Sequence, residues 1–597
     1  MIRDEIVNAV SVERAWRHLE WLCREVPKRL SGGPEEKRAA AYLRDQLSEA
    51  GIPTNLHELV GLVSFPEPSR LTVLEPTDIG EPIVGMTFAH SGSTGPEGVE
   101  GELVYVGAGG EDDYATTDVR GKIVLASLSY APPRPEKARL ASVHGARALV
   151  VINWGPPENP SVPMGTVKAV WGNPTPETLP LLTDLPAVGI SRADGERLRQ
   201  LLARGSVRVR LVAAATREWL PIVEPDGFIE AGGPEKDDFI LFGGHFDAWG
   251  GGATDNATGN VAVLEVARVL AANRDRLRRS VRIVFWPAHE NGIMEGSTWF
   301  VDRFWDDLDA HGVLYLNVDS PGMRGTTRWF VWSSPETVAW HQTIEQQVAP
   351  GIEAERHPLP KIGDQSFFGV GIPAIFPLNQ FDKEQVSAWG GAIFGPWYQS
   401  TDDTIDVADP AALGDALRYY AAYMSDICTR PILPFEFVSV ADIFVRRFDE
   451  LIAAGVPSDL GLRELRDRAL TLRDRAERVR SLTESVNAAL EREDPSGLTD
   501  WPEARILNHA LKSLSRILTA AHSTVCDRYD QDTYGLSALE QPVPALYDAM
   551  QLARLDPTSD EYRLLWSRAI RRRNRVADAL STAIGLIERT LTEVDRK

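Results

Sequence analysis

The sequence predicts an α/β protein with a mainly parallel central sheet, an inserted β-rich domain and a C-terminal helical bundle. Between residues 220 and 432, apolar runs alternate with segments of helical period, a pattern typical of a sheet covered by helices. Short apolar runs separated by Gly- and Pro-rich turns fill residues 66–219, which favours strands. After residue 433, apolar residues recur at three- and four-residue steps, as in packed helices.

The segment 220–432 is the part in which we expect a ligand site. Its apolar runs 239–242, 281–285 and 313–318 have the length of buried strands. In sheets of this kind, ligands gather beyond the carboxyl ends of the strands. Polar residues that follow these runs are therefore the first candidates for function.

The flanking segments are expected to be structural. Residues 38–47 form a helical pattern ended by Gly51 and Pro53, and an extended stretch follows. The β-rich runs of the inserted domain are 102–106, 122–126 and 148–152. The C-terminal stripe, which we interpret as internal core of the bundle, consists of Leu462, Leu465, Ala469, Leu472, Ala476 and Val479.

Composition excludes several classes of protein. The net charge of −22 in 597 residues argues against nucleic-acid and membrane partners, because both bind cationic surfaces. The first residues mix charged and apolar side chains, and no run is long enough to span a membrane, so we expect a soluble, cytoplasmic protein. Three widely spaced cysteines predict neither disulfides nor a thiolate metal site.

The strongest motif is Gly-Gly-His245-Phe-Asp247 directly after an apolar run, followed by Thr-Asp255-Asn-Ala-Thr-Gly. An imidazole and a carboxylate on loops at strand ends suit a divalent ion, typically zinc, and Asp247 is placed to orient the histidine. The structural alternative is that His245 is a satisfied core histidine and that Asp255 caps the helix that follows.

Three further elements end apolar runs or precede helices. They are Pro-Ala-His289-Glu290-Asn, Asn-Val-Asp319-Ser and Trp-Tyr398-Gln399-Ser-Thr-Asp-Asp403. In this order and at these spacings, the four elements resemble the co-catalytic zinc exopeptidases related to glutamate carboxypeptidase and the transferrin receptor. The resemblance covers nearly the whole chain.

This resemblance implies a division into domains. Residues 1–65 and 220–432 would form the two parts of a peptidase domain, 66–219 a protease-associated domain and 433–597 a helical dimerisation-like domain, so a homodimer is expected. His245 and Asp319 would bind one metal ion, and Asp255 would bridge to a second. Tyr398 would stabilise an oxyanion, with packing as its structural alternative, and Asp403 would orient the ligands beside it.

Two departures from the family pattern bear on the mechanism. The family carries two adjacent glutamates, a general base and a ligand of the second metal, where this chain has His289-Glu290-Asn291. Counting forward from Phe285 makes His289 the base and Glu290 the ligand, whereas counting back from Gly296 makes Glu290 the base and Asn291 the ligand. Gln399 replaces the histidine of the second metal, and a carboxamide is a weak zinc ligand.

These departures favour a single-metal enzyme with a His245-Asp255-Asp319 site and Glu290 as the base, although a weak second ion on Glu290 and Gln399 stays open. The expected cofactor is zinc, with manganese or iron as alternatives, and the expected substrate is a peptide or small amide cleaved near a chain end. The competing hypotheses are a catalytically silent relative that binds a ligand or metal, and a different metal-dependent reaction on a small molecule.

Overall fold

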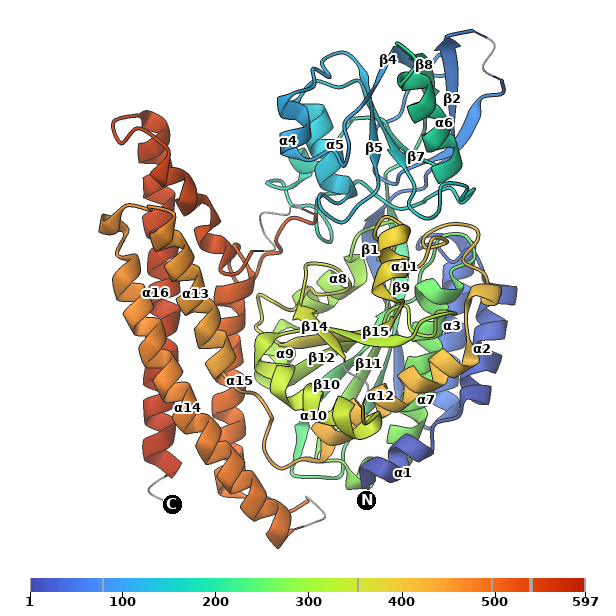
Figure 1. Ribbon diagram of the computed structural model, residues 1–597. Helices are drawn as coiled ribbons and strands as arrows, with labels where there is room; N and C mark the ends of the chain where they lie inside the picture. The colour runs from blue at the N-terminus through green and yellow to red at the C-terminus, as the bar shows by residue number, and fades with distance from the viewer. Residues whose placement is uncertain (1, 78–79, 352–353, 495–497, 536–540, 595–597) are drawn as a thin grey trace.

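The computed structural model describes residues 2–77, 80–351, 354–494, 498–535 and 541–594. Figure 1 shows three parts: an α/β core, a β-barrel above it, and a group of long helices at its side. The barrel lies above the core and the helical group beside it, and residues of all three parts line one cavity.

The core is built on one eight-stranded sheet with both parallel and antiparallel pairs. Its strands, in spatial order, are β1 (Thr54–Val63), β9 (Glu218–Ile229), β11 (Arg279–Trp286), β10 (Glu235–His245), β12 (Gly312–Asn317), β15 (Ala374–Gln380), β13 (Arg328–Ser333) and β14 (Glu355–Pro358). The run β11-β10-β12-β15 is parallel, as is the β13-β14 pair, whereas β1-β9, β9-β11 and β13-β15 are antiparallel.

The expectation of a mainly parallel sheet is therefore corrected to a mixed sheet with a parallel centre. The physical reason lies at its edges, where β1 and β9 form a long antiparallel ribbon and β13 runs against β15. Antiparallel edge pairs of this kind are common on otherwise parallel sheets.

Helices cover both faces of the sheet because successive strand residues point to opposite sides. Ile240 and Phe242 of β10 pack toward one helical layer, and Phe239 and Leu241 pack toward the other. The first layer contains α1 (Ile2–Asn8), α2 (Val12–Glu25), α3 (Pro34–Glu49), α7 (Thr258–Ala272), α10 (Val338–Val348) and α12 (Pro410–Thr429). The second contains α8 (Glu295–Arg303) and α9 (Trp305–His311).

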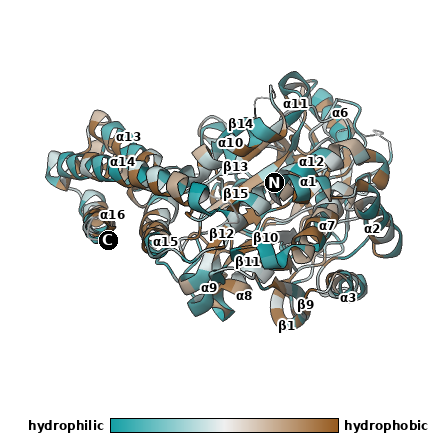
Figure 2. Ribbon diagram, turned by 90° about the horizontal axis from the view of Figure 1, so that it is seen from below, coloured by the Kyte–Doolittle hydropathy of each residue, from teal (hydrophilic) through white to brown (hydrophobic). Residues whose placement is uncertain are grey.

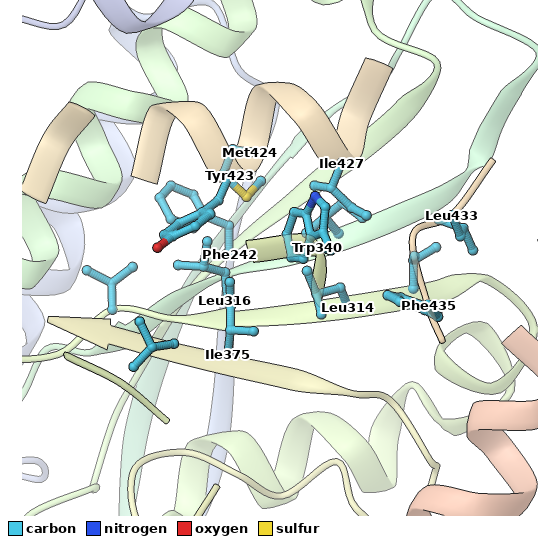
Figure 3. Packing of buried hydrophobic residues seen from close by; sticks show 14 of the residues in the cluster. Phe242, Leu314, Leu316, Trp340, Ile375, Tyr423, Met424, Ile427, Leu433 and Phe435 are labelled. Carbon is cyan, nitrogen blue, oxygen red and sulfur yellow. The ribbon is translucent and has the colours of Figure 1, made fainter. Parts of the chain in front are cut away.

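The packing between the sheet and α12 illustrates how this core is held. Figure 3 shows Phe242, Leu316 and Ile375 of three neighbouring strands beneath Tyr423 and Met424 of α12. All five side chains are buried, and burial of a large apolar side chain contributes about 1.5–3 kcal/mol. The carboxyl ends of the parallel strands are thereby fixed relative to one another.

The inserted segment folds into a closed barrel with helices on its surface. Its strands, in order around the barrel, are β2 (Pro68–Glu75), β3 (Ile83–Thr87), β7 (Ala187–Ile190), β6 (Ala148–Ile152), β5 (Ile123–Ser127), β4 (Val99–Tyr105) and β8 (Arg208–Val212). The helices are α4 (Glu111–Ala115), α5 (Arg134–Val143) and α6 (Arg192–Leu202). The barrel leaves the core after β1 and returns to it at β9.

The C-terminal part is helical, and its apolar stripe is internal. It consists of α13 (Val438–Ala453), α14 (Leu462–Glu493), α15 (Pro502–Ser523), the 3-10 helix η8 (Pro544–Ala553) and α16 (Asp560–Val594). The stripe from Leu462 to Val479 is buried within the chain, as expected. Figure 2 shows these helices grouped beside the core, with hydrophilic residues along α14.

Short elements complete the described structure. They are α11 (Lys383–Ala388) and the helical turns Leu179–Leu181, Ala253–Ala257, Arg274–Arg276, Pro335–Thr337, Ile405–Val407 and Ser458–Leu460. Within the described ranges, none of the helices has both the length and the apolar character that crossing a membrane requires. All three cysteines are free thiols.

Candidate metal centre

The candidate site lies where three parallel strands end. β10 ends at His245, its neighbour β11 ends at Trp286 opposite His245, and its other neighbour β12 ends at Asn317. The loops that follow carry His289, Glu290 and Asp319. Because the carboxyl ends of parallel strands share one edge of the sheet, residues far apart in sequence meet there.

The carboxylates of Asp255 and Asp319 both approach the imidazole of His245. His245 Nε2 lies 3.0 Å from Asp255 Oδ1 and 3.6 Å from Asp319 Oδ1. Its Nδ1 lies 3.0 Å from the main-chain oxygen of Asp247, so the Nδ1 proton is donated there and the Nε2 lone pair faces the carboxylates. All three side chains are buried.

The donor atoms of this cluster are unsatisfied. His245 Nε2, both carboxylate oxygens of Asp255 and Oε1 of Glu290 are buried without a hydrogen-bond partner among the described residues. Burying several anionic oxygens without a compensating cation is costly. The residues therefore fit a divalent cation, which would accept a lone pair from each of them.

Neighbouring carboxylates and burial shift the pKa of two groups in this cluster. Burial alone would lower the pKa of His245, but the neighbouring carboxylates, chiefly Asp319, raise it well above its ordinary value. Burial, reinforced by the charge of Asp255, raises the pKa of Glu290 well above its usual range. Both shifts reflect an excess of negative charge among buried side chains.

Asp247 and Asp403 hold the loops of the site. The carboxylate of Asp247 accepts the backbone N–H groups of His289 at 3.1 Å and Glu290 at 3.0 Å. Asp403 accepts the N–H and hydroxyl of Thr254, both at 2.8 Å, and the N–H of Asp255 at 2.9 Å. Burial raises the pKa of Asp403 to about 6. Each aspartate thus fixes the backbone beside a candidate ligand.

His289 and Glu290 lie on different sides of His245. The imidazole of His289 stacks on that of His245, with ring centroids 3.9 Å apart, and His289 Nδ1 lies 3.1 Å from Asp364 Oδ2. His245, His289 and Asp319 form one group that could hold a metal, and His245, Asp255 and Glu290 form another. Asn291 Nδ2 donates to the main-chain oxygen of Ser31, outside both groups.

Gln399 joins Glu290 to an arginine that sequence reasoning missed. Gln399 Nε2 donates to Glu290 Oε2 at 2.8 Å, and Trp249 Nε1 donates to the same oxygen at 2.7 Å. Arg134, the first residue of α5 in the barrel, donates to Gln399 Oε1 at 2.6 Å. Gln399 itself has a left-handed backbone with φ of 51°, a conformation that residues other than glycine adopt mainly at constrained sites.

A cavity of about 300 Å³ opens onto the cluster. His289, Glu290, Asp319 and Gln399 line it, together with apolar and aromatic residues of the core, barrel residues from Leu128 to Thr166, and Tyr534 and Gly535 of the C-terminal part. Tyr398 also lines it, with its ring stacked on Phe394 at 4.7 Å. Burial raises the pKa of Tyr398 well above its ordinary value, so its hydroxyl remains a hydrogen-bond donor.

Fold and site together define the class: an α/β protein with a candidate metal centre at the carboxyl edge of its parallel strands. Comparison with known proteins names the family. Residues 229–424 match the model of peptidase family M28, and residues 99–198 match the PA domain. The chain is therefore similar to peptidase family M28 over one segment and to the PA domain over the segment before it.

Individual relatives agree with this assignment. The chain is 26% identical to the probable glutamate carboxypeptidase VP8 of Zea mays over 374 residues, which are 53% of this chain and 52% of the relative. It thus spans about half of that relative's length. It is 25% identical to aminopeptidase YwaD of Bacillus subtilis over 416 residues, 66% of this chain and 80% of the relative.

Solved structures show the same fold at low sequence identity. A peptidase M28 precursor from Shewanella amazonensis superposes with a TM-score of 0.59 at 18% identity, covering 72% of this chain and 96% of that one. The zinc aminopeptidase BSAP from Bacillus subtilis superposes with a TM-score of 0.53 at 21% identity, covering 70% and 95%.

Proposed function

We propose that the protein is a metal-dependent hydrolase that cleaves a peptide or other amide bond near a chain end. The observation that carries this proposal is the approach of Asp255 and Asp319 to His245 Nε2, with unsatisfied donor atoms on His245 and Asp255, in a segment that matches peptidase family M28. The cavity beside them has the size of a small-molecule site. By name, the maize and Bacillus relatives act at opposite chain ends, so the reaction class is what they share.

The resident ion is proposed to be a single zinc. One imidazole and two carboxylates form a donor set that suits zinc, and an open fourth position is typical of catalytic sites. A zinc ion bound by His245, Asp255 and Asp319 would supply Lewis-acid polarisation of the scissile carbonyl and activation of water. Manganese and iron also bind nitrogen and oxygen donors, and the test includes them.

His289 is the better-placed general base. Asp364 accepts its Nδ1 proton, which leaves the Nε2 lone pair to take a proton from water and deliver it to the leaving nitrogen. Glu290, which the backward count made the base, has one oxygen occupied by Trp249 and Gln399 and lies beside Asp255. This geometry favours the forward count, with Glu290 in the position of a second-metal ligand.

Tyr398 is proposed as the donor to the developing oxyanion. Its ring is held against Phe394 at the cavity wall, and a neutral hydroxyl held in position there can stabilise developing negative charge. Asp247 and Asp403 are proposed to keep the loop carrying His289 and the backbone of Asp255 in place.

The alternative, a silent relative, predicts an inert metal cluster. The test is elemental analysis of the purified chain, followed by a screen of aminoacyl, N-acyl and terminal-carboxylate amides with zinc, manganese or iron. We expect bound zinc and turnover of at least one class. Absence of metal even after reconstitution, or bound metal without turnover of any amide, contradicts the proposal.

Two substitutions separate the candidate bases. His289→Gln is expected to lower kcat by about 10²–10⁴-fold, as loss of a general base does, while zinc remains bound. Glu290→Gln is expected to keep zinc because the three proposed ligands remain. A larger loss of kcat in Glu290→Gln than in His289→Gln would restore the backward count.

We also propose a cytoplasmic location and a homodimer. The three free thiols are consistent with a reducing compartment, and the long C-terminal helices are the proposed dimer surface. Light scattering on the purified chain tests the dimer, and a mass equal to the monomer's 65.8 kDa would refute it.

A further inference from the structure

We infer that the guanidinium of Arg134, supplied by the PA domain, takes the place of a second metal ion in this centre. The inference rests on the proposed function, because it assumes that the first ion is bound by His245, Asp255 and Asp319. It concerns the neighbouring position, where Glu290 and Gln399 face each other.

The orientation of the Gln399 side-chain amide is fixed by its two neighbours, Arg134 and Glu290. A guanidinium has only donors, so the Gln399 atom that lies 2.6 Å from Arg134 Nη2 is the carbonyl oxygen. The amide nitrogen then faces Glu290 Oε2 at 2.8 Å, where a carboxylate accepts it. Turning the amide over would place oxygen against oxygen and nitrogen against nitrogen.

This orientation removes Gln399 from the ligands available to a metal. A cation is bound by lone pairs, and Gln399 presents N–H groups toward Glu290 instead. Its only lone-pair donor, the carbonyl oxygen, is held by Arg134. Glu290 Oε2 is also occupied, by Gln399 and by Trp249 Nε1 at 2.7 Å, which leaves only Glu290 Oε1 with free lone pairs.

Arg134 is built into this position. Its Nη1 donates to the main-chain oxygen of Met164, and Met164 N in turn donates to the main-chain oxygen of Gln399 at 2.7 Å. The guanidinium lies over the ring of Phe88, 5.6 Å from its centroid. A Cβ on Gly165 would lie 1.9 Å from Arg134 Nη1, so a larger residue there would require the guanidinium to shift.

The charge of Arg134 suits the role. An arginine is charged at every accessible pH and, unlike an ion, cannot dissociate from the chain. It polarises the Gln399 amide and so strengthens the hydrogen bond that Gln399 donates to Glu290. A divalent ion beside Glu290 would meet this fixed positive charge, and the imidazole next to Glu290 is that of His245, which the first ion already uses.

Zinc content per chain tests the inference without relying on activity. The full chain is saturated with zinc, dialysed against a weak chelator and analysed for metal. Wild type and Gln399→His are each expected to retain one zinc, because Arg134 still opposes a second ion. The double variant Arg134→Met/Gln399→His is expected to retain two, with the second bound at least tenfold more tightly than in Gln399→His alone.

Matched variants separate the effect of the Arg134 charge from other effects of the substitution. Arg134→Lys/Gln399→His keeps the positive charge and is expected to retain one zinc. Arg139→Met/Gln399→His removes an arginine of the same helix that pairs with Glu136 at the surface, and is also expected to retain one. Arg134→Gln/Gln399→His provides a second neutral variant if the methionine variant does not fold, as judged by thermal unfolding.

The outcomes separate the two proposals. Two zinc ions in wild type, two in Gln399→His or in the lysine variant, or one in the folded neutral double variants would each refute the role of Arg134 while leaving the proposed function intact. Absence of zinc from every variant would refute the proposed function and, with it, this inference.

Discussion

Replacing Lys168 by methionine is expected to destabilise the junction between the PA domain and the loop that carries His289 and Glu290. Lys168 Nζ donates to Glu295 Oε1 at 2.7 Å, to the main-chain oxygen of Gly172 at 2.8 Å and to that of Gly292. Both charged side chains are fully buried, with 0% exposure. The lysine thereby joins a barrel segment to the residues that follow Glu290.

The magnitude follows from what the substitution leaves behind. Removing one member of a buried ion pair costs about 3–5 kcal/mol, because the other charge stays buried and unpaired. Burial raises the pKa of Glu295 to about 7, and Lys168 acts to lower it. Without the lysine this pKa rises further, so the variant can relieve part of the cost by protonating Glu295.

The expected result therefore depends on pH. A carboxyl whose folded pKa lies above its unfolded value makes the folded state less stable as pH rises from the unfolded pKa toward the folded one. Lys168→Met is thus expected to lose more stability at pH 8 than at pH 5.5. The loss at pH 8 corresponds to a fall in Tm on the order of 10 °C.

Thermal unfolding at the two pH values measures this loss of stability, and two control variants are measured alongside. Lys122→Met breaks a partly exposed pair with Glu102 in the same domain and is expected to change stability by less than about 1 kcal/mol. Lys168→Met/Glu295→Gln removes both charges and is expected to recover most of the loss. A fall in Tm no larger than that of Lys122→Met, or equal at both pH values, would refute the reasoning.

Three further predictions concern the centre and the bundle. Asp403→Ala frees the N–H groups of Thr254 and Asp255 and is expected to weaken zinc binding about 10–100-fold in chelator competition; unchanged affinity would contradict it. Zinc at 100 times its Kd is expected to stabilise the chain by about 2.7 kcal/mol, seen as a rise in Tm that EDTA reverses; an unchanged Tm would count against a folded-state metal site. Burial lowers the pKa of His522 to about 4, so the stability that its neutral form contributes, about 3 kcal/mol, is present above pH 6.5 and is lost as pH falls from 6.5 to 4. His522→Gln should reduce this loss of stability with pH in denaturation followed by far-UV circular dichroism. An unchanged dependence of stability on pH would contradict the role of His522.

The proximity of the candidate ligands could be expected from sequence because each residue is close to a strong local signal. His245 ends an apolar run, Asp319 follows another, and Asp255 lies in a glycine-rich turn before a helix. Parallel strands then bring such positions to one edge, whatever the details of packing. The mixed order of the sheet could not be read in this way, because the β1-β9 pairing joins residues on either side of the whole barrel.

The proposed roles of His289 and Glu290 could be assigned only from the backbone conformation of their loop. The forward count from Phe285 and the backward count from Gly296 differ by one residue. The structure has left-handed residues at both ends of this loop, Ala288 before it and Ile293 and Met294 after it. We interpret the second turn as the place where the additional residue is accommodated. Arg134 was beyond prediction because its contact with Gln399 exists only once the barrel is docked on the core.

The antiparallel ribbon of β1 and β9 holds the two ends of the inserted barrel side by side. Val63, where the chain departs for the barrel, is the direct cross-strand partner of Glu218, where it comes back. Topologically, then, the whole barrel is the loop of one antiparallel hairpin, and closing a loop of that length adds little entropy beyond that of a shorter one. Replacement or reshaping of this loop would alter the cover over the candidate metal centre while the strand registers beneath it stayed the same.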